Sequence, residues 1–384
     1  MCESTHSPAS APAGTHPVAR VPCTGSRWVS RESCPPSLGE HIVSTNPVEF
    51  NEDQPTPRKK HTGRNILLVL LGIVLVIGVV AGFFVWNLAR NFDNGAQNLE
   101  SAFPEESSRP AKGSSEDAGT TVLLLGSDKR PEGQDPTVTG SRADSIMLLH
   151  IPEDGGEMYV MSIMRDTWVD IPGHGEAKIN SALDVGGMPT MVSTIEQNFD
   201  TRVDEVALVD FAGFEGLTDA LGGVTVDVPV SFTTRDGHQF QKGPQEMNGE
   251  EALAFVRERY AFPDGDYQRV RNQRAYLEGL INELVSAGTL TNPMKLNEVV
   301  KQISPYLTVS DGLTAGWIAQ QAPKMVGMSS SDIHMFTVPN QGLGTSADGQ
   351  SIIIADEAAM KEIGKAISGG TLDQYAKSVG QSGQ

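Results

Sequence analysis

The hydrophobic positions of the chain form one long uninterrupted run, near the N-terminus, and many short ones. The segment Ile66–Trp86 contains no charged residue and consists mainly of Leu, Ile and Val with a few glycines. At about 1.5 Å per helical residue it is long enough to cross the ~30 Å hydrocarbon core of a bilayer. Basic residues from Arg58 to Arg64 precede it, so the positive-inside rule places residues 1–64 in the cytoplasm. The pattern predicts a single-pass protein of the cell membrane whose larger part is extracellular.

Short apolar runs after residue 120 have the lengths of strands. Thr121–Leu125 is a continuous apolar run, typical of a central strand that is buried on both faces. Asp144–Ile151 and Glu157–Ile163 flank the turn-forming segment 152–156 and therefore predict a hairpin. Two further strands are predicted over Glu205–Asp210 and Val224–Val228.

Helical patterns alternate with these strands. Asp266–Ala287 is the clearest helix, because its apolar residues form one stripe, Asp266 can cap its start and Gly288 follows its end. Strands and helices that alternate over about 250 residues predict one α/β/α domain with a central, mostly buried mixed sheet. The other predicted helices are Pro189–Phe199, Phe211–Leu221 and Asn248–Val256.

Composition divides the chain into regions. Residues 1–57 are rich in Ser, Pro and Thr and hold too few large apolar residues to offset the entropy of an ordered chain, so we expect disorder. The regions expected in order are a disordered cytoplasmic tail (1–64), a transmembrane helix (65–88), a linker (89–120), the folded domain (121–370) and a flexible C-terminal tail (371–384).

Charge and cysteine content narrow the possible functions. The chain carries 29 Lys and Arg against 48 Asp and Glu, a formal net charge of −19. Such an acidic chain lacks the cationic footprint of a nucleic-acid-binding protein. The three cysteines, Cys2, Cys23 and Cys34, all precede the apolar run, so the outer domain must be stable without disulfides.

Charged residues stand at the ends of three predicted strands. Asp128 follows the central strand, Arg142 and Asp144 begin the next, and Arg165 follows the third. Any one of them alone is more simply a turn residue or a surface ion pair. If the three strands are neighbours, Asp128 and Asp144 share one cation, with Arg142 and Arg165 beside it.

A denser basic cluster lies farther along the chain. We expect the helix that begins at Asn248 to end near Val256, because Arg257 and Arg259 share a face only in extended chain. Arg269 lies in the first turn of the next helix, where a cation opposes the helix dipole unless an anion is also present. A solvated charged face is the alternative reading. Arginine forks suit phosphate oxygens, however, and carboxylates with arginines predict a metal–pyrophosphate site that binds Mg²⁺ or, alternatively, Mn²⁺.

No nucleotide-binding P-loop and no nucleophile elbow occur in the sequence. Because there is no ATP outside the cell, we expect a phosphate-bearing substrate there to be attached to a lipid carrier.

Seven motifs follow one another along the chain: LLLGSD (123–128), SRADSIMLL (141–149), SIMRDTWVDIPGHG (162–175), KINSA (178–182), ALGGVTVDVP (220–229), NGEEALAFVRERY (248–260) and GDYQRVRNQR (265–274). In this order they resemble the motifs of the LytR-CpsA-Psr family of cell-wall enzymes. Met164 is a departure, since the family usually has Pro before the Arg-Asp pair.

The resemblance implies a phosphotransferase that moves a glycopolymer from a polyprenyl-pyrophosphate carrier onto peptidoglycan. It also assigns roles. Asp128 and Asp144 would hold the metal. Arg165, Asp144, Arg257 and Arg259 would be catalytic, and the pyrophosphate would be bound by Arg142, Arg165, Lys178, Arg257, Arg259, Arg269 and Gln273. The base for the acceptor hydroxyl stays open between Asp144 and Asp266. An apolar tunnel for the lipid would be lined in part by Phe211, Phe214, Leu217 and Leu221, although helical spacing of this kind is also typical of ordinary core.

Three other functions compete with this one. The domain could bind a lipid pyrophosphate without turnover, although a pure anion binder has no use for Asp128 and Asp144. It could be a pyrophosphatase that uses water as the acceptor, or a membrane-bound regulator of the cell envelope.

Overall fold

The computed structural model describes residues 82–99, 101–112, 118–127, 143–286, 293–321, 324, 328 and 330–378. Residues 1–64, most of the apolar run, Asp128 and Arg142 lie outside these residues, so the predictions that concern them stay predictions. Among the described helices, none combines the length and the hydropathy that a bilayer span requires.

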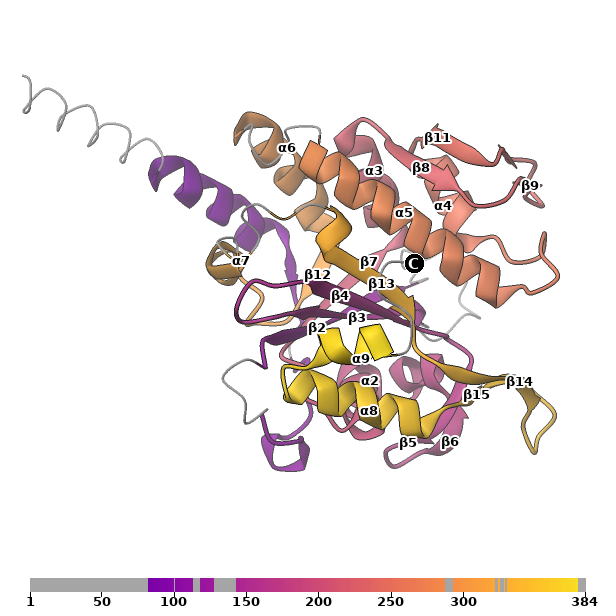
Figure 1. Cartoon of the computed structure of the whole chain (residues 1–384). Helices are drawn as coiled ribbons and strands as arrows, with labels where there is room; N and C mark the ends of the chain where they lie inside the picture. The colour runs from indigo at the N-terminus through magenta and orange to yellow at the C-terminus, as the bar shows by residue number, and fades with distance from the viewer. Residues whose placement is uncertain are drawn as a thin grey trace, which may run out of the picture. The chain divides into compact units, whose positions relative to one another are not determined.

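A seven-stranded mixed sheet forms the centre of the fold, with the strand order β1-β12-β7-β2-β3-β4-β13 (Figure 1). β2 occupies the middle, where it pairs in parallel with β7 and antiparallel with β3. The central strand and the β3–β4 hairpin were both predicted, and both are confirmed. The strands are β1 (Gln97–Asn98), β2 (Thr120–Ser127), β3 (Ala143–Ile151), β4 (Met158–Ile163), β7 (Glu205–Asp210), β12 (Leu307–Val309) and β13 (Ile333–Thr337).

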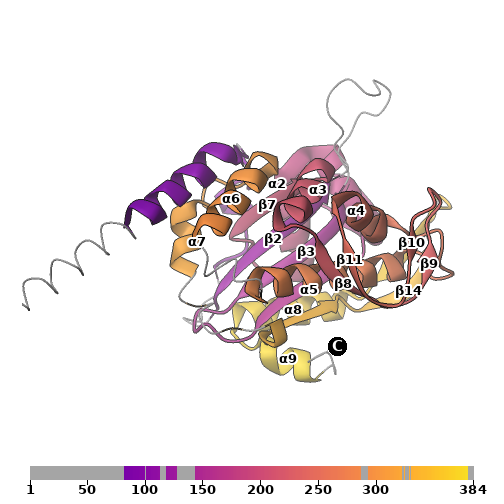
Figure 2. The ribbon, with the colours of Figure 1, turned by 90° about the horizontal axis from the view of Figure 1, so that it is seen from above.

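Helices cover both faces of this sheet, as predicted (Figures 1 and 2). On one face, α2 (Ala182–Phe199), α8 (Glu357–Ser368) and α9 (Leu372–Ser378) pack on the sheet. Leu123 and Leu125 of β2 belong to this core and are almost fully buried. The helix predicted over Pro189–Phe199 starts earlier, at Ala182, and bends at Gly187, whose φ of 69° lies in the left-handed region that glycine tolerates.

The opposite face carries α3 (Phe211–Leu221), α4 (Gly249–Arg257) and α5 (Asp266–Ser286). These helices form a second core with β8 (Val224–Val228) and β11 (Gly243–Met247), which pair with each other outside the central sheet. Asn248 caps α4, as predicted, because its side chain accepts from the Glu251 amide while the Glu251 carboxylate accepts from the Asn248 amide.

Smaller elements complete the fold. A four-stranded sheet has the order β14-β15-β5-β6, and β9 pairs with β10 in a short hairpin. Residues 82–95 are helical and precede β1. The remaining elements are β5 (Thr167–Ile171), β6 (Gly175–Lys178), β9 (Phe232–Thr233), β10 (Gln239–Phe240), β14 (Asn340–Thr345), β15 (Ser351–Ala355), α6 (Pro293–Ile303), α7 (Ala315–Gln321) and the 3-10 turns Glu106–Ser108, Ile179–Ser181, Ser304–Tyr306 and Ser330–Asp332.

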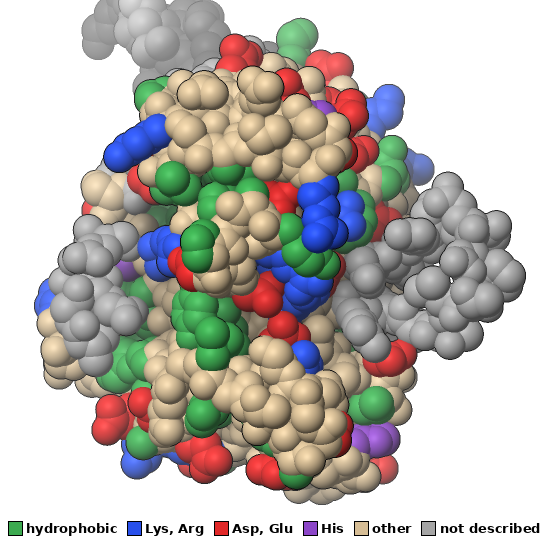
Figure 3. All heavy atoms as spheres, turned by 90° about the vertical axis from the view of Figure 1, so that its right-hand side faces the viewer, with side chains coloured by type: hydrophobic (Ala, Val, Ile, Leu, Met, Phe, Trp, Pro, Cys, Tyr) green, Lys and Arg blue, Asp and Glu red, His purple; other side chains and the backbone are tan. Residues whose placement is uncertain are grey.

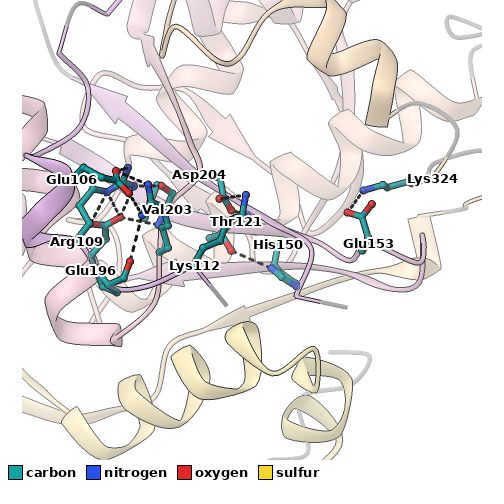
Figure 4. Close-up of polar contacts among 12 residues, drawn as sticks. Glu106, Arg109, Lys112, Thr121, His150, Glu153, Glu196, Val203, Asp204 and Lys324 are labelled. Carbon is teal, nitrogen blue, oxygen red and sulfur yellow. Dashed lines mark hydrogen bonds and ion pairs between the residues drawn. The ribbon is translucent and has the colours of Figure 1, made fainter. Parts of the chain in front are cut away.

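The predicted linker, 89–120, is wrong where the structure describes it. The helix over 82–95 continues past residue 88, and Phe92 on it is buried against Val122 and Val309. β1 then joins the central sheet. Farther on, Arg109 makes a buried ion pair with Glu196 (Figure 4). The polar composition of the segment did not predict this order, because the residues that bind the segment lie in distant parts of the chain.

The predicted flexible tail, 371–384, is also wrong over its first part. Leu372 and Ala376 of α9 are buried in the core beneath the central sheet. Residues 379–384 lie outside the described residues. Together with Tyr375, which packs against the same core, these contacts along one short helix order a segment whose composition is mainly polar.

Candidate functional site

A cavity of about 670 Å³ lies between the central sheet and the helices α3, α4 and α5. Its floor follows from strand alternation: Leu123 and Leu125 point into the core beneath the sheet, so Leu124 faces the other way. Leu124 pairs with Met147 on β3, and both line the cavity. The apolar part of the wall comprises these two residues with Ala207, Val209, Phe211, Phe214, Leu217, Leu253, Leu277, Leu280 and Leu307, among others.

The other part of the wall is strongly charged. Asp144, Arg165, Arg257, Arg259 and Arg269 all line it. Figure 3 shows basic and acidic side chains gathered around a hollow near the middle of one face of the molecule. The structure therefore brings residues from β3, the β4–β5 loop, α4 and α5 to one place, although they are spread over more than a hundred positions in the sequence.

Arg165 stands on a tight turn between β4 and β5. The amide of Thr167 donates to the Met164 carbonyl at 3.0 Å, and the Asn180 amide donates to the Arg165 carbonyl at 3.2 Å. Met164 is buried against Val270 and Ile353. Met164 thus anchors this turn by packing.

Three carboxylates surround the Arg165 guanidinium. Its Nη1 lies 2.5 Å from Asp144 Oδ1, and its Nε lies 3.7 Å from Asp166 Oδ2 and 3.8 Å from Asp266 Oδ1. Burial acts to lower the pKa of Arg165, but the three negative charges together outweigh it and raise that pKa. Arg165 is therefore a permanent cation in the cavity wall.

Asp266 is the carboxylate that the arginines share. Predicted as the cap of α5, it is instead the first residue of that helix. Its Oδ1 lies 2.7 Å from Arg269 Nη2, and its Oδ2 lies 3.9 Å from Arg259 Nη1. Arg269 is 5% exposed, and burial together with the nearby Arg165 lowers its pKa. Among the described residues, neither Arg165 Nε nor Arg269 Nε has a hydrogen-bond partner.

Arg257 and Arg259 both line the cavity, as their expected common face requires. α4 ends at Arg257, one residue later than predicted. The Arg257 guanidinium lies over the Phe211 ring at 4.3 Å, and Arg259 donates to the Tyr260 hydroxyl at 2.6 Å. Glu258 between them is extended, so the two arginines reach the cavity from the end of α4 and from the chain that follows it.

Some of the remaining predicted site residues line the cavity and others do not. Gln273 lines the cavity. Lys178 does not contribute to the described wall; its Nζ lies 3.4 Å from Asp166 Oδ1, behind Arg165. Phe211, Phe214 and Leu217 line the apolar part as expected, but Leu221 does not, because it is buried in the core with β8 and α5.

The donor set for a metal is small. The described part of the chain contains no group of three His, Cys, Asp or Glu side chains placed to hold an ion. Asp144 is present beside the arginines. One such carboxylate fits Mg²⁺, which proteins bind through one or two carboxylates and the phosphates of a substrate.

Sequence reasoning assigned no role to three residues of this region. Asp166 lies between Arg165 and Lys178. Glu258 is buried, and its carboxylate accepts from the amides of Arg259, Tyr260 and Ala261 at 2.6–3.0 Å. Arg235 reaches the cavity from the β9–β10 turn. Asp166 and Glu258 could have been found from the sequence, because each is next to a predicted site arginine. No local sequence pattern marks Arg235.

Comparison with known proteins places these features in a family. The model of the LytR_cpsA_psr family matches residues 84–368. The chain is 29% identical over 339 residues to the cell wall biosynthesis protein LcpA of Corynebacterium glutamicum, covering 76% of this chain and 61% of LcpA.

The chain is also similar to two proteins of Bacillus, TagU by sequence and TagV by structure. The polyisoprenyl-teichoic acid–peptidoglycan teichoic acid transferase TagU of Bacillus cereus is 33% identical over 231 residues, which is 59% of this chain and 74% of TagU. The crystal structure of B. subtilis TagV superposes with a TM-score of 0.56 at 27% identity, covering 66% of this chain and 97% of TagV.

Proposed function

Because the chain belongs to the LytR_cpsA_psr family, we propose that it is a transferase that moves a glycopolymer from a polyprenyl-pyrophosphate carrier onto peptidoglycan. Relatives named as a cell wall biosynthesis protein and as a teichoic acid transferase support the transferase class and the acceptor. The observation that carries the donor is the cavity, which joins a long apolar wall to a cluster of arginines. A prenyl chain needs an apolar surface and the pyrophosphate attached to it needs cations, so both must line one continuous cavity.

The reaction is a substitution at phosphorus. A hydroxyl oxygen of the acceptor sugar attacks the phosphorus that carries the glycopolymer, and a new phosphorus–oxygen bond forms. The bond from that phosphorus to the bridging oxygen breaks, and polyprenyl phosphate leaves with the electron pair. The hydroxyl proton passes to a base, for which Asp144 and Asp266 both stay candidates.

Arginines suit this reaction because negative charge grows on the bridging and equatorial oxygens as the bond breaks. Arg269 is buried, Arg165 is partly buried, and both are held in place by Asp144 and Asp266, so little reorganisation is needed when the pyrophosphate enters. Arg257 and Arg259 lie on the same wall. We assign binding of the pyrophosphate to these four residues.

The metal is part of the proposal. Asp144, together with Asp128, would hold Mg²⁺ beside the arginines. When bound, the ion would neutralise charge on the phosphate oxygens. Arg165, which pairs with Asp144, would orient that carboxylate.

The location is a proposal as well. The segment Ile66–Trp86 would anchor the protein in the cell membrane, with residues 1–64 in the cytoplasm and the domain outside. This arrangement would bring the cavity to the side of the membrane on which peptidoglycan is assembled.

The test is transfer by the full-length protein in detergent. The donor is a polyprenyl-pyrophosphate-linked disaccharide labelled in its sugar, and the acceptor is a peptidoglycan oligomer. We expect Mg²⁺-dependent release of polyprenyl phosphate and label in the peptidoglycan, and we expect loss of both with Arg165→Ala. The matched control is Arg271→Ala, an exposed arginine of the same helix as Arg269, which pairs with Asp264. Polyprenyl phosphate released without labelled peptidoglycan would identify a pyrophosphatase instead.

A further inference from the structure

The charged wall of the cavity continues outward to an aromatic side chain at its edge. The Tyr260 hydroxyl accepts from Arg259, whose Cζ lies 4.6 Å from the centre of the tyrosine ring. The guanidinium of Arg235 lies over the same ring at 3.7 Å. Arg235 and Tyr260 both line the cavity.

Contacts run from the interior to the surface along this wall. Arg165 meets Asp266, Asp266 meets Arg259, and Arg259 meets Tyr260. The side chains of these first three are 16%, 23% and 33% exposed, and Tyr260 is 58% exposed. Arg235, at the end of the series, is exposed. The series therefore marks the direction in which the arginine-rich end of the cavity opens to solvent.

Both outer residues are held firmly. The buried Glu258 carboxylate accepts from the amides of residues 259–261 and so fixes the backbone that carries Tyr260. Thr234 and His238 exchange hydrogen bonds across the turn that carries Arg235. Phe262 meets Phe232 edge to face at 4.7 Å, which ties the two segments together. A rigid, exposed aromatic residue at a cavity mouth loses little entropy on binding a ligand.

Arg235 differs from three of the arginines farther in. Arg165, Arg259 and Arg269 are paired with carboxylates, whereas Arg235 has neither an ion pair nor a hydrogen bond within the described residues. Its N–H donors stay available at the surface. A guanidinium can donate to several acceptors in one plane, and the hydroxyl groups of a sugar are such acceptors.

We propose that Arg235 and Tyr260 form a subsite for the sugar that is attached directly to the pyrophosphate. This inference rests on the proposed function: with the prenyl chain along the apolar wall and the pyrophosphate among the inner arginines, the first sugar must lie where the charged wall reaches the surface. There, the Tyr260 ring would hold the Arg235 guanidinium in place, and Arg235 would donate to the hydroxyl groups of the sugar. The pair would thus help to select the glycopolymer.

The test compares ligands with and without a sugar, using Arg235→Ala in the full-length protein. The probes are geranylgeranyl pyrophosphate and two geranylgeranyl-pyrophosphate-linked sugars, the neutral N-acetylglucosamine and the acidic glucuronic acid. We expect binding of at least one sugar-bearing probe to weaken about tenfold, the lower range for a hydrogen bond to a charged group. Binding of the sugar-free probe should stay the same. Arg235→Gln, which is shorter but polar, serves if the alanine variant does not fold.

Each outcome has a distinct meaning. Equal loss with all three probes would overturn the subsite, because Arg235 would then serve the pyrophosphate. Unchanged binding of both sugar-bearing probes would overturn it as well. Failure of the wild-type protein to bind even geranylgeranyl pyrophosphate would instead contradict the proposed function. Arg271→Ala is the control and should match the wild type with every probe.

Discussion

Two buried arginines of this domain have opposite surroundings. Arg109 donates from Nε and Nη2 to Glu196 and from Nη2 to the Val203 carbonyl, and its side chain is 5% exposed (Figure 4). Arg269 is equally buried, yet it shares Asp266 with Arg165 and Arg259, and its Nε has no hydrogen-bond partner in the described part of the chain. Arg109 is the one cation on Glu196 among the described ion pairs, whereas Arg269 shares its single carboxylate with two other arginines.

This difference in partners distinguishes a structural arginine from one that can bind a ligand. A buried ion pair of this kind holds its arginine in place within the framework, and its loss exposes an uncompensated charge to the core. A cluster with buried, unused donors and several arginines on one carboxylate is costly when empty and is relieved by an anion. Burial and residue type are the same in both places, so only the partners distinguish the two roles.

The largest expected effect is on stability, from Arg109→Ala. Glu196, which is 2% exposed, would keep only the Val203 amide as a partner, so we expect a loss of about 3–5 kcal/mol in the free energy of unfolding. In a domain of this size that corresponds to a fall in Tm on the order of 10 °C. Thermal unfolding measures it, and turnover per folded molecule should not change. The control is Lys112→Ala, whose exposed ion pair with Asp204 should contribute less than about 1 kcal/mol.

The next effect is on catalysis, from Arg165→Ala. Loss of one positioned charge that stabilises a transition state lowers turnover by about 10²–10³-fold. Stability should fall less than with Arg109→Ala, since the three carboxylates around Arg165 are 17–25% exposed and can be hydrated once it is gone. Initial rates of polyprenyl phosphate release and a melting curve of the same sample give both numbers. A large fall in Tm with normal turnover would show that Arg165 resembles Arg109 and not Arg269.

The third effect is a pH dependence in the structural region. His150 is buried beside Thr121, and burial lowers its pKa to about 4, against the opposing effect of Asp204. Because the folded pKa lies below the unfolded value of 6.5, the neutral imidazole contributes its full stability above pH 6.5 and loses it as the pH falls toward 4. We expect a loss of roughly 3 kcal/mol over that range. Melting curves of the wild type and His150→Gln between pH 7 and 4 should converge at the acid end; parallel curves would contradict the assignment.

The sequence predicted most of the central fold because its signals are local. β7 and α3 have the predicted bounds, and α5 begins at the predicted residue. Alternation and capping are properties of neighbouring residues, so a single sequence contains them. The convergence of Arg165, Arg257, Arg259 and Arg269 was also predictable, since each stands at the end of an element where the chain leaves its core.

What the sequence could not predict depends on distant partners. Arg109 lies in a polar segment, and Glu196, which orders it, is 87 positions away. Arg235 reaches Tyr260 only because β9 and β10 fold the turn back over α4. Asp266 has the local signature of a helix cap, and its use by three arginines follows from the packing of α5 against the β4–β5 loop.

The smallest expected effect is the change in stability caused by Arg259→Ala. The Arg259 side chain is one-third exposed and lies 3.9 Å from Asp266, which keeps the closer Arg269. We therefore expect the free energy of unfolding of the empty domain to change by less than about 1 kcal/mol. Binding should respond more, because a hydrogen bond to a charged phosphate oxygen contributes about 1.5–3 kcal/mol. The measurement is Tm with and without geranylgeranyl pyrophosphate.

In that measurement the ligand-induced rise in Tm should shrink while the Tm of the empty variant stays near the wild-type value. Arg271→Ala, an arginine that pairs with Asp264 on the outer side of the same region, should leave both quantities unchanged. If the empty Arg259→Ala protein instead melts far below the wild type and keeps the full ligand-induced rise, then Arg259 belongs with Arg109 as part of the framework. The cluster around Asp266 would then have to be reinterpreted as a structural network.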